Sequence, residues 1–281
     1  MTPSALAALL VICAALLSAA YNTIIKTGED RLVVGAMTGG VAAALALAAL
    51  PFVAPPPPAA WGCLAVSVLA QTAYYFTIVE AYRDGDLSLV YPVMRGTSLT
   101  IIVAFAILAA GEGLATAKLL GLLLLFAGIL AAADPAAWVR PETRRPALYA
   151  ALTGLAVAAY LLADGLGARR SPEPLGYVAW LFFLGGLPIV AIVGFLRRGA
   201  LERAWRRNWR RGVASGVVTA AGYGAVVWAL SLGTFASVAA LRELTTVFTV
   251  LIARFLLDEQ PPLRLWLAVG LIVLGATAIN A

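Results

Sequence analysis

Long runs of apolar residues recur along the whole chain and are the feature that most restricts its fold. A transmembrane helix needs about 20 mostly apolar residues to cross a hydrocarbon core of roughly 30 Å. Backbone groups find no partners in lipid, so spanning segments must be helices or strands of a closed barrel. The length of these runs and their lack of alternation select helices. The ten predicted spans are residues 3–26, 32–54, 59–82, 87–110, 116–134, 146–168, 175–196, 212–232, 235–257 and 263–280.

Composition excludes the soluble classes of protein. The 281 residues are 62% hydrophobic and only 12% charged, whereas about 25% of the residues of a soluble domain are charged. So little charge cannot cover a water-facing surface, which rules out a soluble enzyme, a nucleic-acid-binding protein and a disordered chain. The first run contains Ser18-Ala19-Ala20, which resembles a signal cleavage site. Because no basic segment precedes the run and the run is too long, we expect a retained helix.

The chain offers little for catalysis or metal binding. It contains no histidine, the commonest metal ligand and general base. Its two cysteines, Cys13 and Cys63, lie inside apolar runs, where buried and inert thiols are expected. No metal-ligand spacing and no G-x-x-x-x-G-K-[ST] motif occur. We therefore expect neither a cofactor nor ATP-driven pumping.

The two halves of the chain resemble each other weakly. A shift of 147 residues aligns Arg95 with Arg242, Glu112 with Glu259 and Gly128 with Gly275. Each half holds five predicted spans, an odd number, so the second half must enter the membrane upside down. Inverted repeats of this kind are a transporter architecture with a binding site near the midplane. We predict an all-α integral membrane protein of ten transmembrane helices, with residues 1–134 and 146–281 as two inverted five-helix repeats and residues 135–145 as a connecting loop.

The basic residues are distributed unequally between the two membrane faces. The face that holds both termini receives Lys118, Arg169 and Arg170. The opposite face receives Lys26, Arg31, Arg83, Arg140, Arg144, Arg145, Arg264 and seven arginines between Arg197 and Arg211. The positive-inside rule predicts that this basic face is cytoplasmic and that both termini lie outside a bacterial inner membrane. The high isoelectric point then reflects topology and not a nucleic-acid partner.

The basic segment at residues 197–211 also has an apolar stripe. Leu201, Trp205 and Trp209 share one helical face, which favours an interfacial helix on anionic lipid. A charge cluster that serves only to orient the chain is equally compatible with this pattern. Two small-residue patterns that allow close helix contact, and are compatible with a homodimer, are Gly35-x-x-x-Gly39 and Gly212-x-x-x-Gly216.

Two arginines at membrane depth are the principal functional candidates. Arg95 and Arg242 each lie about 10–12 Å into their spans, at 1.5 Å per residue. The two spans enter from opposite faces, so the guanidinium groups can converge on a central cavity, where they would suit a carboxylate or phosphate group. Pro92 and Gly96 flank Arg95 and weaken its helix, which could free backbone groups for a ligand.

Internal neutralisation of these arginines is the alternative. Glu243 adjoins Arg242, Arg254 lies on the stripe of Glu243, and Glu80 ends the third span. Pairing and substrate contact both stay open. The residues predicted to bind substrate are Arg95, Arg242, Tyr91, Ser98, Gln71, Tyr74, Tyr75, Tyr223, Thr245 and Thr246. Those predicted to act in gating or coupling are Glu243, Glu80, Asp164, Asn22 and Lys26.

Three segments resemble the EamA family of the drug/metabolite transporter superfamily. They are residues 20–26, residues 81–96, and residues 240–243 followed by Asp258-Glu259 and Gly275. The resemblance extends over essentially the full length, with one EamA unit in each half. It implies a cavity lined by spans three, four, eight and nine. Many relatives have both termini inside, contrary to the charge distribution. Members of the bacterial subgroup that this chain resembles typically carry histidine in place of Ser18 and often in place of Gln71, so a role of those histidines in proton coupling does not carry over to this chain.

The leading functional hypothesis is a secondary transporter for a small polar metabolite, anionic or zwitterionic. Transport would proceed by alternating access, as the two halves rock around a midplane site. Arg95 and Arg242 would engage the anionic group. The alternatives are a non-transporting membrane scaffold or sensor, and an intramembrane enzyme, for which the sequence offers no nucleophile–base or metal constellation. The resemblance does not fix the substrate.

Overall fold

The computed structural model describes residues 2–25, 31–113, 116–133, 141–197, 199–256, 258 and 260–280, with side chains described except at 21–25, 31, 87–88 and 141. Every long element in these ranges is a helix. The first half contains α1 (Pro3–Ile25), α2 (Arg31–Ala49), α3 (Pro58–Asp84), α4 (Leu87–Leu108) and α5 (Thr116–Ala132). The second half contains α7 (Arg144–Arg170), α8 (Pro174–Leu196), α9 (Ala200–Leu232), α10 (Phe235–Arg242), α11 (Leu244–Phe255) and α12 (Leu263–Asn280).

Length and apolar composition make these helices membrane spans. Among the described residues, 9 helical stretches are long and apolar enough to cross a membrane, with α10 and α11 counted as one stretch. The helix α5 is equally apolar but has only 17 residues. The class predicted from the sequence, an all-α integral membrane protein, is confirmed.

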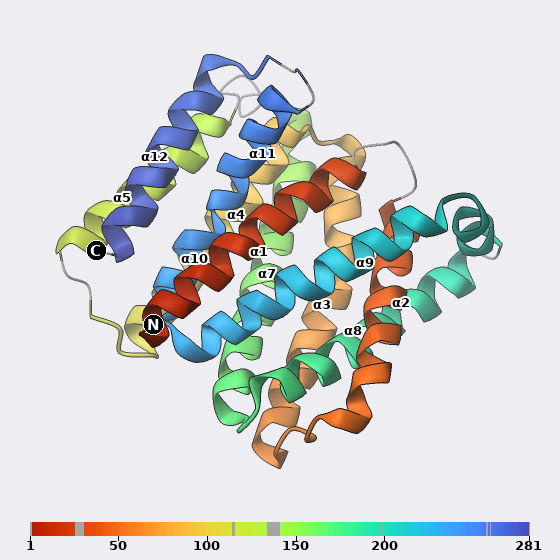
Figure 1. The fold of residues 1–281 in the computed structure, drawn as a ribbon. Coiled ribbons are helices and arrows are strands. Elements are labelled where there is room, and N and C mark those ends of the chain that lie inside the picture. The colour runs from red at the N-terminus through yellow and green to blue at the C-terminus, as the bar shows by residue number, and fades with distance from the viewer. Residues whose placement is uncertain are drawn as a thin grey trace.

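Two helices differ from the predicted spans. The helix α9 begins at Ala200 and runs through the arginine-rich segment into the span, with a non-helical backbone at Asn208 (φ −133°). The predicted interfacial segment and the eighth span therefore form one kinked helix. The predicted ninth span is divided at Glu243 into α10 and α11. The amino end of α9 lies at the opposite side of the molecule from the two chain termini (Figure 1).

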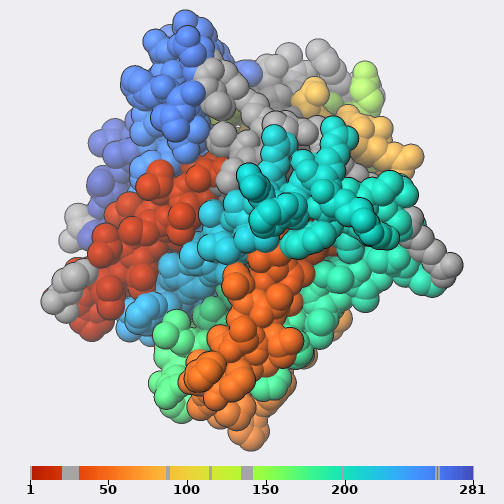
Figure 2. All heavy atoms as spheres, turned by 45° about the vertical axis from the view of Figure 1, so that its right-hand side comes forward, coloured from red at the N-terminus to blue at the C-terminus, as the bar shows by residue number. Residues whose placement is uncertain are grey.

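The helices of the two halves pack against one another in pairs. The strongest pairings are α3 with α7, α5 with α12, α1 with α9 and α2 with α8, each uniting one helix from each half (Figure 1). Figure 2 shows α2, in orange, lying directly on α8 and α9. In order along the chain, α1, α2, α3 and α5 of the first half correspond to α7, α8, α9 and α12 of the second. When corresponding helices are exchanged, the α1–α9 pair becomes the α7–α3 pair, while the α2–α8 and α5–α12 pairs are unchanged. The halves are thus interleaved and do not form two separate bundles.

Small residues permit the close helix pairs. A Cβ atom added at Gly39 would lie 2.9 Å from Ile189 on α8, and one at Gly216 would lie 2.5 Å from Val41 on α2. Both small-residue patterns therefore face helices of the same chain. A Cβ atom at Gly154 on α7 would approach the carbonyl oxygen of Met94 on α4 to 2.5 Å, so only glycine allows α7 this close to the helix that carries Arg95.

A matched pair of substitutions tests this close approach. We expect Gly154→Ala to destabilise the protein by about 1–3 kcal/mol, because the added methyl group meets backbone of α4 that cannot move away. The control is Gly62→Ala on α3, where an added Cβ meets nothing within 4 Å; it should be neutral or stabilising by up to about 1 kcal/mol. Thermal unfolding in detergent measures both. Equal melting temperatures for the two variants would contradict the packing of α4 on α7.

Candidate functional site

The helix that carries Arg242 is interrupted directly after it, and the helix that carries Arg95 contains a proline one turn before it. At the junction of α10 and α11, the N–H of Glu243 bonds the carbonyl of Ala240 (3.1 Å), and the N–H of Thr246 bonds that of Glu243 (3.0 Å). These are i−3 bonds of the 3₁₀ type, which interrupt the regular α-helical pattern. The helix α4 contains Pro92, one turn before Arg95. In a membrane protein, irregular backbone at this depth is tolerated where it is buried in protein or lines a cavity.

An ion pair and a hydrogen bond join these two helices. The Nη1 atom of Arg95 lies 3.5 Å from Oε1 of Glu243, and their side chains are 15% and 4% exposed. The Arg95 guanidinium also lies over the ring of Tyr91, 5.3 Å from its centre. The hydroxyl of Tyr91 and that of Thr246 are 2.7 Å apart. Arg95, Tyr91, Thr246 and Glu243, four of the predicted residues, therefore form one buried cluster.

The ion pair leaves polar atoms without partners. Among the described residues, neither Nε of Arg95 nor Oε2 of Glu243 has a hydrogen-bond partner, although both atoms are buried. Leaving such an atom unsatisfied costs about 1–3 kcal/mol. A polar ligand or a water molecule within hydrogen-bond distance of either atom would satisfy it.

Arg242 is placed differently from Arg95. It is the last residue of α10 and is partly buried. It forms no hydrogen bond or ion pair with another described residue, yet it lies close enough to Glu243 and Asp164 to interact with both carboxylates electrostatically. Its guanidinium is thus held near two negative charges without a direct bond to either, which leaves its donors available to a ligand.

A second buried carboxyl group, that of Asp164, also interacts electrostatically with Arg242. Asp164 of α7 is fully buried, and its carboxyl oxygens accept hydrogen bonds from the hydroxyls of Tyr177 on α8 (3.1 Å) and Tyr223 on α9. The ring of Tyr223 contacts that of Tyr160, and the ring of Tyr160 contacts that of Tyr74, with centroids 5.6 and 6.3 Å apart. Tyr74 and Tyr160 in turn lie within electrostatic range of Arg95. A row of tyrosines thus leads from one charged cluster to the other.

Other predicted residues make no described hydrogen bond to the side chains of the Arg95–Glu243 cluster. The Ser98 hydroxyl donates to the carbonyl of Arg95 (3.0 Å) in its own helix, and Nε2 of Gln71 donates to the Ser67 hydroxyl (2.9 Å). The ring of Tyr75 packs against Gly35 on α2, so closely that a Cβ atom added at Gly35 would lie 2.8 Å from it. Thr245 is buried in α11 with no side-chain hydrogen bond to another described residue. The side chain of Asn22 and all of Lys26 lie outside the described residues.

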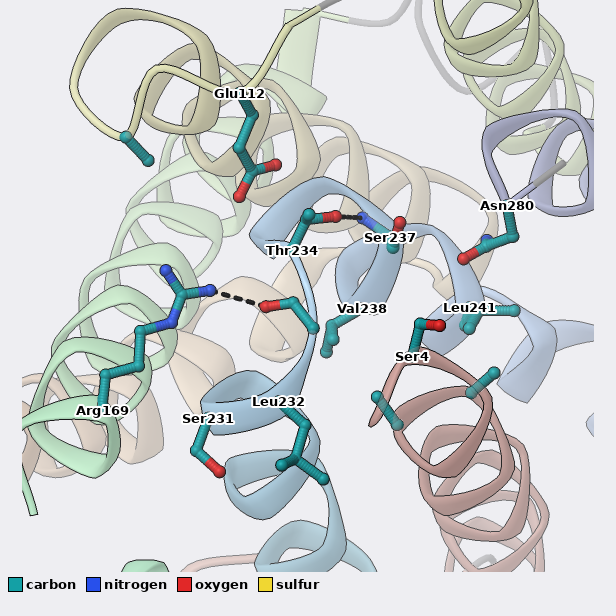
Figure 3. Close-up of a pocket in the computed structure, with 14 residues that line it drawn as sticks. Ser4, Glu112, Arg169, Ser231, Leu232, Thr234, Ser237, Val238, Leu241 and Asn280 are labelled. Carbon is teal, nitrogen blue, oxygen red and sulfur yellow. Dashed lines mark hydrogen bonds between the residues drawn. The ribbon is translucent and has the colours of Figure 1, made fainter. Parts of the chain in front are cut away.

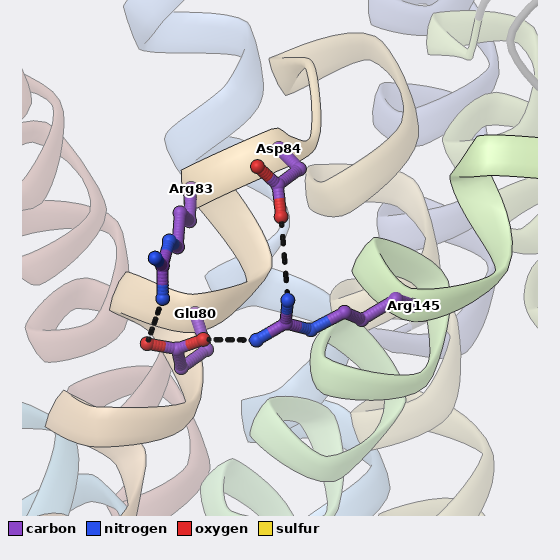
Figure 4. Close-up of polar contacts among 4 residues, drawn as sticks. All are labelled: Glu80, Arg83, Asp84 and Arg145. Carbon is purple, nitrogen blue, oxygen red and sulfur yellow. Dashed lines mark hydrogen bonds and ion pairs between the residues drawn. The ribbon is translucent and has the colours of Figure 1, made fainter.

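Glu80 forms a surface cluster at the end of α3 (Figure 4). Its carboxylate lies 2.9 Å from Nη2 of Arg145 on α7 and 3.6 Å from Nη1 of Arg83, and Arg145 also lies 3.8 Å from Asp84. At the other end of the same helix pair, Arg170 donates to the carbonyl of Ala59. The two helices are therefore antiparallel and joined at both ends. Glu80 holds α3 and α7 together and does not face the central cluster.

This arrangement gives a prediction for Glu80. We expect Glu80→Gln to lower the stability of the protein by about 1 kcal/mol or less, because ion pairs between exposed side chains are weak and screened by salt. Transport should stay within about twofold of the wild type. Initial uptake rates in proteoliposomes check this; a loss as large as that expected for Arg95 variants would show that Glu80 acts in gating.

The structure supports internal neutralisation for Arg95, but with a different partner for Glu243 from those considered from the sequence. Its partner is Arg95, and not the adjacent Arg242 or the more distant Arg254, which pairs with Asp258 at 3.3 Å. Consecutive residues of a helix point in different directions, and residues three turns apart are far beyond contact. The partner therefore comes from α4, a helix that no local pattern could identify.

The sequence missed Tyr177 and the role of Glu112. The Glu112 carboxylate, in the loop after α4, accepts hydrogen bonds from the backbone N–H groups of Phe235 and Ala236 (2.7 and 3.2 Å) and caps α10. The guanidinium of Arg169 donates to the carbonyl of Gly233 (2.7 Å) just before that cap (Figure 3). The alignment of Glu112 with Glu259 between the two halves was the only sign in the sequence that Glu112 has a structural role. A cavity of about 470 Å³ at the chain-terminal end is lined by Glu112, Arg169 and Gly233 together with Ser231, Thr234, Ser237 and Asn280.

Comparison with known proteins identifies the fold and then the family. One solved crystal structure of a protein matches with a TM-score of 0.78 and 22% sequence identity, covering 97% of each chain, so the two share a fold. No curated protein matches the sequence. Residues 144–281 match the model of the EamA-like transporter family. This part of the chain therefore belongs to the EamA-like transporter family, within the drug/metabolite transporter superfamily, and the resemblance predicted from the sequence is confirmed for residues 144–281.

Proposed function

We propose that the protein is a secondary transporter that moves a small anionic or zwitterionic metabolite across the bacterial inner membrane by alternating access. The observation that carries this proposal is the buried Arg95–Glu243 pair, with one unpartnered polar atom on each side chain. Arg242, whose donors have no partner among the described residues, interacts electrostatically with the same carboxylate, Glu243. In this proposal the two guanidinium groups bind one carboxylate or phosphate group.

The surrounding hydroxyls and rings support recognition of a solute. In this proposal, Tyr91 and Thr246 present hydroxyls beside Arg95, while Tyr74 and Tyr223 form the wall opposite. Charged and polar side chains at membrane depth are expensive unless they pair or serve a function. Because the family is a transporter family, passage of a solute is the function that accounts for them best.

We propose ten spans in two inverted repeats, with residues 1–134 and 146–281 as the units and 135–145 as the connection. The interchange of helix pairs between halves supports this arrangement, since a two-fold axis in the membrane plane would produce it. The family match, which begins at residue 144, supports the boundary of the second unit. The helix α5 would then be a short span, paired with α12.

The interleaved packing favours moving parts other than the two halves. We define a first unit of α3, α4 and α7, and a second unit of α1, α9, α10 and α11, since helices within each unit pack closely. The Arg95–Glu243 pair, the Tyr91–Thr246 hydrogen bond and the Asp164–Tyr223 hydrogen bond all cross between these units. Motion of one unit against the other would open and close the site from alternate faces.

We also propose an orientation with the basic face in the cytoplasm and both termini outside. The amino end of α9 supports this, because Trp205 and Trp209 are 40% and 49% exposed beside exposed arginines. Such a combination suits the headgroup region of an anionic leaflet. The kink at Asn208 would let residues 200–207 follow the membrane surface while the rest of α9 crosses it.

Flux through reconstituted vesicles tests the proposed function. The probes are radiolabelled lactate, pyruvate and benzoate as monoanions, and alanine and phenylalanine as zwitterions. A carrier shows saturable uptake of at least one probe, and a trapped unlabelled pool of that probe accelerates the uptake. An enzyme would consume its substrate, and a scaffold or sensor would do neither. Protein-free vesicles give the background, and absence of accelerated uptake for every probe would contradict the proposal for this substrate class.

A further inference from the structure

We propose that Asp164 takes up one proton for each monoanion that enters the site, so that an anion and a proton cross the membrane together, whereas a zwitterion crosses without a proton. This inference rests on the proposed transport function. It assigns the coupling, which the sequence left open among Glu243, Asp164 and Glu80, to one residue and gives it a stoichiometry.

The charges of the described site set this stoichiometry. Two cations and two carboxylates come together there: Arg95, Arg242, Glu243 and Asp164. With all four ionised, the empty site has no net charge. A bound monoanion would leave one uncompensated negative charge in a medium of low polarity, which is costly. One proton restores neutrality, while a zwitterion adds no charge and needs none.

Asp164 is the carboxyl group best placed to accept that proton. Glu80 lies in the exposed cluster with Arg83 and Arg145, away from the site. Glu243 forms an ion pair with Arg95, and a proton on Glu243 would break that pair. Asp164 has no ion pair with a described residue, and its hydrogen bonds come from uncharged hydroxyls.

The groups that face Asp164 come from the helices packed around it. Helix α8 presents Tyr177, α9 presents Tyr223, α3 presents the hydroxyl of Ser67, and the end of α10 presents Arg242. On α4, the charged residue Arg95 is engaged by Glu243 instead. Arg242 is therefore the cation that responds to the charge of Asp164.

Protonation of Asp164 would release Arg242 to the anion. A proton from one aqueous face forms an O–H bond with a carboxyl oxygen of Asp164, and its charge changes from −1 to 0. The attraction of Asp164 for Arg242 is then lost, and the guanidinium can engage the anionic group. After the units move, the anion leaves to the other face and the O–H bond of Asp164 breaks, giving the proton to water there. The hydrogen bond between Asp164 and Tyr223 joins the first unit to the second. Protonation of Asp164 therefore also changes a contact between the two moving units.

Calorimetry on the purified full-length protein counts the protons. Binding heats of lactate, pyruvate and benzoate, and of alanine and phenylalanine, are measured in two buffers with different ionisation enthalpies. We expect about one proton taken up per monoanion bound and none per zwitterion. In Asp164→Asn the amide oxygen can accept one of the two tyrosine hydrogen bonds and the amide NH2 can donate to the other tyrosine oxygen, and the proton uptake should fall to zero. The matched control Asp84→Asn, at an exposed carboxylate, should retain it.

Other outcomes separate this inference from the proposed function. Zero protons per anion in the wild type, or one proton retained in Asp164→Asn, would overturn the coupling while leaving transport standing. Infrared difference spectra of the unliganded protein between neutral and acidic pH supply a readout that needs no ligand: a protonated-carboxyl band should appear on acidification, be absent in Asp164→Asn and be kept in Asp164→Glu. Absence of such a band in the wild type overturns the inference, whether or not a probe binds. A band with no binding of any probe would contradict the substrate class alone.

Discussion

Arg95→Gln is expected to reduce transport by at least about 25-fold. Truncating one partner of a buried charge pair costs about 2–5 kcal/mol, and each 1.4 kcal/mol corresponds to about a factor of ten. The variant also leaves Glu243, which is 4% exposed, as an uncompensated buried charge. We therefore expect a second effect, a loss of stability of about 3–5 kcal/mol. Uptake rates in vesicles and melting temperatures in detergent measure the two effects separately.

The double variant Arg95→Gln with Glu243→Gln separates stability from function. It removes both charges, so much of the lost stability should return, whereas transport should not. The matched control is Arg254→Gln in α11, where the arginine pairs with the exposed Asp258 and little change is expected in either measurement. Recovery of transport in the double variant would show that the ion pair serves folding and that Arg95 does not bind the solute.

Arg242→Gln is expected to lower transport strongly, which is the second large effect, with a smaller loss of stability than Arg95→Gln because a proton on Asp164 can cancel the charge that the variant leaves. This arginine has no hydrogen bond or ion pair with another described residue, so its removal leaves no broken pair behind. The anionic group of the solute would, however, lose its contact with this guanidinium, which we expect to weaken solute binding by about 2–5 kcal/mol in a site of low polarity. Uptake rates and melting temperatures measured beside Arg254→Gln check this. Normal uptake in Arg242→Gln would remove this residue from the site.

The contrast between the two arginines distinguishes the competing interpretations. If both serve only to stabilise the fold, each variant should lower the melting temperature, and transport should fall only as far as folded protein is lost. If both bind solute, transport per folded molecule falls in each variant, while stability falls chiefly in Arg95→Gln. The geometry favours the second result, because only Arg95 has a direct carboxylate partner among the described residues.

The helices could be predicted from the sequence because their cause is local. Apolar runs of about 20 residues fix which segments cross a bilayer, whatever they pack against. The boundaries failed where a helix continued beyond its apolar part, as at Ala200, and where a polar residue interrupted one, as at Glu243. The length and hydropathy of an apolar run indicate neither the extension of a helix into a polar segment nor a break inside a helix.

The contents of the site were less predictable because its contacts join distant helices. Burial and depth identified Arg95 and Arg242, since charge inside a membrane is costly and therefore informative. The partner of Glu243 could not be predicted, because it depends on which helix lies opposite α10 and α11. Tyr177 was missed for the same reason: a single tyrosine near a helix start gives no sign that its hydroxyl reaches Asp164 on the preceding helix.

The most direct test of the central claim is anion-induced stabilisation of four proteins side by side. A ligand that binds the native state raises the melting temperature by mass action. The wild type, Arg95→Gln, Arg242→Gln and Arg254→Gln are heated with and without saturating lactate, pyruvate or benzoate. We expect at least one of these anions to raise the melting temperature of the wild type and Arg254→Gln, and to have no effect on Arg95→Gln and Arg242→Gln. The same rise in all four proteins, or no rise with any anion in the wild type, would contradict an anion site between the two arginines.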